Sequence, residues 1–214
     1  MIPSLNAPRL VAKGHILRVL GVDPAVAGAT GYGIVEFEGS RPHLVRFGAL
    51  KLPVRATFAA RLREIHTLIA RLVEEYAPDA VAVESVFTAL NMGTALRLAE
   101  MRGVVLLAAA QAQIPAHSYS PREVKASVVG YGAASKQQMQ QMVSSLLGLT
   151  EYPEPADAAD ALAVALCHAH ASQARDRIAA ATKIRAIAIS PLTGLRGKQP
   201  APRNRSRAAR IQEL

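Results

Sequence analysis

The stretch Ile16-Leu-Arg-Val-Leu-Gly-Val-Asp23 is a short run of mostly branched apolar residues that ends in an acid. A run of this kind is typical of a buried strand. A turn region with three glycines follows over residues 24–33, and apolar segments suited to strands cover residues 32–37 and 43–52. Parallel neighbours would need a crossover of about a dozen residues or more, so the short connections predict an antiparallel meander of three strands.

Beyond this meander the apolar residues recur at helical spacing. From residue 58 to residue 72 they are three or four positions apart, with Thr57 as a cap and Pro78 as a stop. Further strands are expected over 79–84 and 116–120, and further helices over 90–113, from Pro121 onward, over 135–147 and over 156–170. The pattern predicts an α/β fold, in which three antiparallel strands and then parallel strands form a mixed sheet flanked by helices.

Length and charge divide the chain into three parts. Its 214 residues suit one domain with extensions. We expect an N-terminal extension over 1–15, the folded domain over 16–172 and a basic, partly disordered tail over 173–214. Residues 174–214 hold ten Lys/Arg and two Asp/Glu, whereas residues 1–173 hold fifteen and fourteen, so the net charge of +9 lies almost wholly on the tail. A basic tail indicates a polyanionic partner without specifying it.

The composition also indicates a compartment. The single cysteine, Cys167, excludes an internal disulfide and is typical of a reducing, cytoplasmic environment. No apolar run approaches the roughly 20 residues of a membrane span. Residues 1–14 contain Pro3 and Pro8 and lack the continuous apolar core of a secretory signal.

Four carboxylates occupy positions where acids are costly unless they have a partner. Asp23 ends the first strand and Glu84 ends the fourth, while Asp157 and Asp160 share one face of the last helix at spacing i, i+3. Oxygen donors without nearby His or Cys suit a hard cation such as Mg²⁺ or Mn²⁺. Two such ions can clamp the oxygens of a phosphoryl displacement. The alternative for the helical pair is simple stabilisation by the helix dipole.

The chain resembles the RuvC family of bacterial Holliday-junction resolvases, which have a ribonuclease H-like fold. The resemblance covers about residues 16–172 and rests on Gly21-Val-Asp-Pro24, Thr30-Gly-Tyr-Gly33, Ala82-Val-Glu-Ser-Val-Phe87, Arg102-Gly103, Val128-Val-Gly130 and Ala156-Asp-Ala-Ala-Asp-Ala-Leu162. It implies that the four acids bind two Mg²⁺ ions, with Mn²⁺ as a substitute. It also implies a homodimer that nicks two opposed strands of a four-way junction in DNA recombination and repair, with the RuvA-RuvB branch-migration complex as partner.

Six further residues are candidate DNA contacts, three of them through the resemblance. Phe87 would stack on a base near the junction centre, and Lys125 and Lys136 would lie near the cleft, where Lys125 would also act catalytically by neutralising charge on the scissile phosphate. The remaining three are Asn91, Arg97 and Arg102. Structural alternatives stay open for these residues. Phe87 could be a core residue, the lysines could lie on the surface, Arg97 could be solvated, and Arg102 could pair with Glu100 or another acid.

Three departures from the family pattern leave the four acids in place. Ala25 stands where a glycine usually follows the Asp-Pro pair, the loop from Asp23 to Thr30 is one residue longer, and Leu90 replaces a basic residue. The altered loop motivates one rival function, a junction-binding scaffold without cleavage. The other rival is an actin-like phosphotransferase, which also begins with a strand, an acid and a glycine-rich turn but usually needs a far longer chain.

Three other motifs favour structural roles. His168 and His170, beside Cys167, are two positions apart and point to different helix faces, which argues against a shared metal. The glycines over residues 28–33 lack the Lys-Ser/Thr of a P-loop and favour a hairpin connection. The helical stripe Leu98, Met101 and Val105 indicates core or dimer contact.

Overall fold

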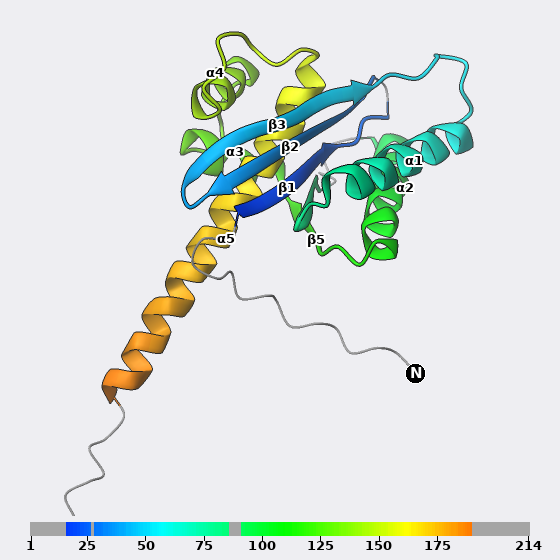
Figure 1. Ribbon diagram of the computed structural model, residues 1–214. Helices are drawn as coiled ribbons and strands as arrows, with labels where there is room; N and C mark the ends of the chain where they lie inside the picture. Colours follow the sequence, from blue (N-terminus) through cyan, green and yellow to red (C-terminus); the bar gives the residue numbers. More distant parts are fainter. Residues whose placement is uncertain (1–15, 27, 86–90, 190–214) are drawn as a thin grey trace, which may run out of the picture. The chain divides into compact units, whose positions relative to one another are not determined.

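The computed structural model describes residues 16–26, 28–85 and 91–189 (Figure 1). The chain divides into two compact units, residues 1–176 and 177–214. The first unit contains the sheet and the helices packed on it. The described part of the second unit is helical as far as Ile189.

The first unit is built on a five-stranded sheet. Along the chain the strands are β1 (Ile16–Asp23), β2 (Thr30–Glu38), β3 (Arg41–Leu50), β4 (Ala80–Glu84) and β5 (Ala116–Tyr119), and their order in the sheet is β3-β2-β1-β4-β5. The pairs β1–β2 and β2–β3 are antiparallel, whereas β1–β4 and β4–β5 are parallel. This arrangement confirms the predicted mixed sheet.

Five helices accompany the sheet: α1 (Phe58–Tyr76), α2 (Met92–Gln111), α3 (Pro121–Val129), α4 (Lys136–Leu146) and α5 (Ala156–Ile189). Thr57 caps α1 as predicted, and Ser120 and Ser135 form capping boxes at α3 and α4. None of the described helices combines the length and apolarity that a membrane span requires.

Helix α5 is longer than the sequence pattern predicted. It continues beyond residue 170 to Ile189, because residues 171–189 contain neither glycine nor proline and are rich in alanine. The helix therefore runs through residue 172, where we placed the end of the folded domain. The domain boundaries themselves stay a prediction, and the extension 1–15 and the tail from residue 190 lie outside the described residues.

Two apolar cores form because alternate strand residues point to opposite faces of the sheet. On one face Leu20 and Val22 pack with α1 and α2, and Met101 and Val105 belong to this core, so two residues of the predicted α2 stripe are core residues. On the other face Val19 and neighbouring strand residues pack with α3, α4 and α5. Figure 1 shows α1 and α2 to one side of β1, with α5 crossing behind the strands.

Glycines in β1 and β2 let the backbone of α5 approach the sheet closely. A Cβ atom on Gly31 would lie 1.9 Å from the carbonyl oxygen of Asp157, and one on Gly21 would lie 2.1 Å from that of Ala161. Gly28, with φ +122°, belongs to the connection between the strands, as predicted for this glycine region. Gly31 and Gly33 lie inside β2 instead, so the prediction is wrong for these two, and Gly31 makes room for the first turn of α5.

Candidate active site

The ends of two parallel strands bring Asp23 and Glu84 together. In the register of β1 and β4, Val22 lies beside Val83, so the next residues, Asp23 and Glu84, emerge at the same edge of the sheet. Ligands of open α/β sheets bind at this carboxyl edge. A hydrogen bond between the two side chains lowers the pKa of Glu84, opposing the larger effect of burial.

The first turns of α5 bring the other two acids to that edge. Asp157 and Asp160 are both half-buried, and the carbonyl oxygen of Asp157 rests against Gly31, which pairs with Asp23 across β1 and β2. Gly21 and Gly31 thus support the site, although our reading of the sequence gave neither this role. A glycine inside a strand is the signal that could have revealed them, because it often marks the close approach of another backbone.

Electrostatic interactions link Asp23 to each of the other three predicted acids. Burial raises the pKa of Asp23 well above its usual value, and repulsion from Glu84, Asp160 and Asp157 raises it further. Burial also raises the pKa of Glu84, with a second contribution from Asp160. Each of the two strand acids is therefore repelled by at least one carboxylate on α5. We call Asp23, Glu84, Asp157 and Asp160 the acid cluster, and these four acids carry an excess of negative charge.

Two lysines partly offset this negative charge. The Nζ atom of Lys136, at the start of α4, lies 3.1 Å from a carboxylate oxygen of Asp160, and this hydrogen bond raises the pKa of Lys136. Lys125 on α3 lowers the pKa of Glu84 by its charge. Both lysines that the resemblance assigned to the cleft therefore face the acid cluster.

The donor set suits a hard divalent cation in its chemistry. All four side chains offer carboxylate oxygens, and their mutual repulsion would be relieved by a bound cation. In the described part of the chain, however, no three acidic, His or Cys side chains converge closely enough to hold an ion as they stand.

The predicted DNA contacts have structural partners within the protein. Asn91 caps α2 by accepting a hydrogen bond from the backbone of Thr94 at 2.8 Å. The guanidinium of Arg97 lies 5.6 Å from the ring centre of Phe58. Arg102 donates to the hydroxyl of Ser118 at 2.5 Å, and among the described residues it forms no ion pair with an acid. Phe87 and Leu90 lie outside the described residues, and the DNA-binding roles stay predictions.

The histidines of α5 have separate partners. His168 is buried and shares a hydrogen bond of 2.9 Å with the hydroxyl of Tyr119, while His170 contacts Ser127. Burial lowers the pKa of His168 to about 3, and burial raises the pKa of Cys167 to about 11. His168 and Cys167 are therefore neutral members of the core at pH 7.

Comparison with known proteins shows the family. The family model described as "Crossover junction endodeoxyribonuclease RuvC" matches residues 19–168. The chain is 47% identical over 154 residues to the protein of that name from Syntrophomonas wolfei, covering 72% of this chain and 89% of the relative. It is 49% identical over 152 residues to that from Heliobacterium modesticaldum, covering 71% and 93%.

A solved structure agrees with the sequence comparison. The structure described as "T. thermophilus RuvC in complex with Holliday junction substrate" superposes with a TM-score of 0.70 at 33% identity, covering 75% of this chain and 97% of that one. Its match supports the ribonuclease H-like fold that the resemblance implied. The chain therefore belongs to the RuvC family of crossover junction endodeoxyribonucleases.

Proposed function

We propose that this protein resolves four-way DNA junctions by paired, symmetric nicks in recombination and repair. The relatives are named crossover junction endodeoxyribonucleases, and the Thermus protein was solved with a Holliday junction substrate. The observation that carries the proposal is the convergence of the acids that end β1 and β4 at one edge of the sheet, with the first turn of α5 packed against Gly31 at that edge. Repelling carboxylates are expensive to bury, so their gathering here indicates a catalytic role.

Nucleases of this family depend on divalent metal ions. In this chain Asp23, Glu84, Asp157 and Asp160 would hold two Mg²⁺ ions, with Mn²⁺ as a substitute. Bound divalent cations supply polarisation of a phosphoryl oxygen and activation of the attacking water. The ion pair with Lys136 engages one carboxylate oxygen of Asp160, so the other oxygen could serve as a ligand.

The protein's own side chains orient the reaction and balance its charge. Asp23 and Glu84 emerge side by side at the strand ends, where burial and repulsion from nearby carboxylates raise the pKa of both carboxyl groups. Lys125 faces Glu84, where its ammonium group would neutralise charge that develops on the scissile phosphate. The products would be a 5′-phosphate and a 3′-hydroxyl, which a ligase can seal.

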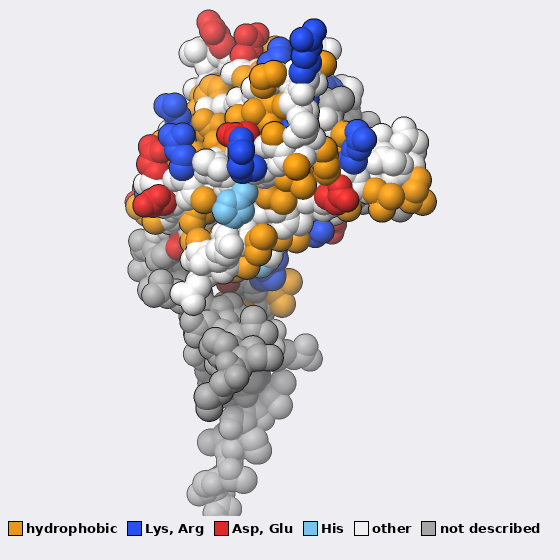
Figure 2. Space-filling model, turned by 90° about the vertical axis from the view of Figure 1, so that its right-hand side faces the viewer, with side chains coloured by type: hydrophobic (Ala, Val, Ile, Leu, Met, Phe, Trp, Pro, Cys, Tyr) orange, Lys and Arg blue, Asp and Glu red, His pale blue; other side chains and the backbone are white. Residues whose placement is uncertain are grey.

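An exposed apolar face of α2 supports the homodimer that paired cuts require. Met92, Leu96 and Leu107 are 75%, 58% and 52% exposed and lie on one side of the helix. Figure 2 views the side of the molecule on which α1 and α2 lie, and hydrophobic side chains cover much of that surface. Two symmetric cuts need two sites related by a twofold axis, and α2 offers the surface for it. The proposal extends to the RuvA-RuvB complex as partner and to a cytoplasmic location.

Variants at the strand ends test the proposal on a synthetic four-way junction labelled on opposed strands. Asp23→Asn and Glu84→Gln should bind the junction but lose cleavage in Mg²⁺. Glu38→Gln is the matched control, because Glu38 is an exposed acid that ends β2 beside Ile16, at the opposite edge of the sheet. Full cleavage by Asp23→Asn would refute the site assignment, whereas binding without nicking by the unaltered protein would favour the scaffold function.

A further inference from the structure

Residues 39–63 contain no acidic residue but six cations, although the first 173 residues are nearly neutral overall. This acid-free segment includes β3, the connection from β3 to α1, and the start of α1. β3 is an edge strand that pairs only with β2 within the sheet. Positive charge is therefore concentrated on one margin of an otherwise balanced domain.

The carboxyl end of β3 lies at the same sheet edge as the acid cluster. Asp23 pairs with Gly31 of β2, and Gly31 pairs in turn with Ala49 of β3. Two strand spacings therefore separate Asp23 from Ala49, a distance of about 10 Å. Lys51 follows β3 directly, so the positive connection starts beside the proposed cutting site.

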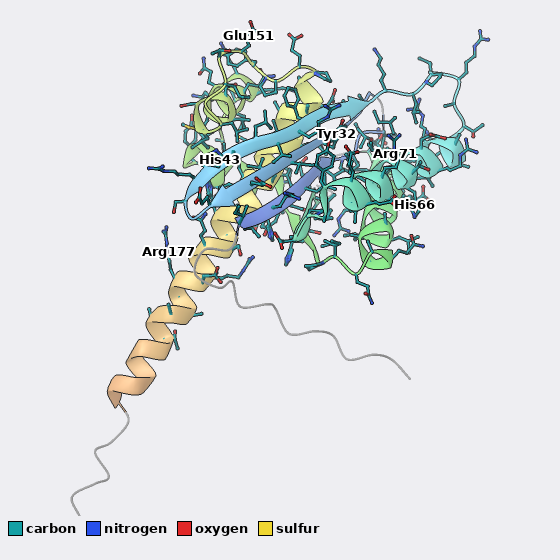
Figure 3. The ribbon with its side chains drawn as sticks, viewed as in Figure 1. Tyr32, His43, His66, Arg71, Glu151 and Arg177 are labelled. Carbon is teal, nitrogen blue, oxygen red and sulfur yellow. The ribbon has the colours of Figure 1, made fainter. Side chains whose placement is uncertain are left out.

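The cations of this connection are exposed and available. Lys51 and Arg55 are exposed, and neither forms an ion pair with any carboxylate of the described residues. Val54 between them is 94% exposed, which shows how far the connection stands out from the domain. Figure 3 shows side chains of this connection extending outward with nitrogen at their tips.

Two further arginines adjoin the connection. The Nη2 atom of Arg61 donates to the carbonyl of Pro53 at 3.4 Å, which ties the connection to the first turns of α1. Arg97 of α2 lies over Phe58, the first residue of α1, at 5.6 Å. We call Lys51, Arg55, Arg61 and Arg97 the β3–α1 basic surface. It is made by three elements and does not depend on the basic tail.

We propose that the β3–α1 basic surface binds the phosphate backbone of the duplex arm that adjoins the cut site. This inference rests on the proposed function, because it assigns one part of the junction to one surface. Duplex DNA carries one charge per about 1.7 Å of axis, so an arm that leaves the acid cluster meets Lys51 and Arg55 within a few phosphates. Contacts of this kind fix the register of the DNA without reading its sequence.

The salt dependence of DNA binding tests the surface directly. The double variant Lys51→Ala/Arg55→Ala is compared with Arg41→Ala/Arg71→Ala, which removes the same charge from exposed positions at the start of β3 and on α1. Binding is measured without divalent metal on a linear duplex and on a four-way junction between about 50 and 200 mM salt. Each lost phosphate contact reduces the slope of log K against log salt by about 0.9 in magnitude. The slope should therefore decrease by about 1.8 for Lys51→Ala/Arg55→Ala and change little for the control variant.

The outcomes separate this inference from the proposed function. Equal slopes for the two double variants would overturn the inference. The inference would also be overturned if Lys51→Ala/Arg55→Ala kept the slope of the unaltered protein but changed its mass in sedimentation, because the surface would then contact protein. If the unaltered protein neither prefers nor cleaves the junction, the proposed function fails, while the slopes on linear duplex still decide whether this surface binds DNA.

Discussion

Gly31→Ala tests how the sheet positions the acids of α5. Gly31 pairs with Asp23 in the sheet and lies against the backbone of Asp157. A methyl group at this position would lie 1.9 Å from the carbonyl oxygen of Asp157 and 2.4 Å from its carbonyl carbon. Both atoms are backbone, so no side chain can rotate away to make room.

The size of the effect follows from these distances. Ordinary contact begins at 3.4 Å, so the first turn of α5 must recede by about 1.5 Å. Overpacking of this kind costs about 1–3 kcal/mol, or about 3–9 °C in Tm at about 3 °C per kcal/mol. Because Asp157 moves with the turn, we expect a larger effect on cleavage, since a misplacement of 1 Å can cost about 100-fold.

Thermal unfolding and junction cleavage are measured on a series of glycine variants. Gly21→Ala should resemble Gly31→Ala, because its methyl group would meet the backbone of Ala161 at 2.1 Å. Gly33→Ala should be milder, since its closest contact is with the side chain of Leu162. Gly103→Ala, inside α2 with no atom within 4 Å, is the stability control and should raise stability by about 1 kcal/mol. Unaltered Tm and cleavage in Gly31→Ala would refute the close approach of α5.

Three further predictions concern charge. Asp23→Asn should raise the Tm of the metal-free protein by a few degrees, because burial and three neighbouring acids raise the pKa of Asp23 and disfavour its charged form. A Tm equal to or below that of the unaltered protein would contradict this prediction. Burial lowers the pKa of His168 from 6.5 to about 3, so as pH falls the unfolded chain binds this proton before the folded protein does. The free energy of unfolding should therefore decrease by up to about 1.4 kcal/mol per pH unit between pH 6.5 and about pH 3. His168→Gln should flatten the pH dependence of urea unfolding in that window, and an unchanged pH slope would exclude this origin. Deleting residues 191–214 removes six cations and should weaken the salt dependence of junction binding without moving the cut sites, whereas loss of cleavage at low salt by a folded protein would count against a purely electrostatic tail.

The sequence predicted the elements well because their signals are local. Thr57, Ser120 and Ser135 cap the helices they precede, as side-chain oxygens satisfy the first free backbone amides whatever the rest of the chain does. Apolar runs located β1, β2 and β4, and short connections predicted the antiparallel meander. The continuation of α5 to Ile189 was missed because the apolar pattern fades after residue 170, although the sequence carries a stop signal, Pro191, just beyond the helix.

For the site, the sequence determined that four acids were present and that two strand ends and one helix face carried them. It did not determine which side chains contact the predicted site residues. The ion pair of Lys136 with Asp160 joins residues 24 positions apart, and the capping role of Asn91 competes with its predicted DNA contact. Such pairings depend on how helices dock, which no short stretch of sequence encodes.

The sequence by itself determined four acids, a mixed sheet and a basic tail. Only the tertiary structure decided that Gly21 and Gly31 admit the backbone of α5, that the acids then repel one another at one edge, and that the cations after β3 emerge beside them. The physical reason is that the interactions involved act over different separations along the chain. Capping and periodicity act within a few residues, whereas close packing and charge coupling act between atoms that only the folded chain brings together.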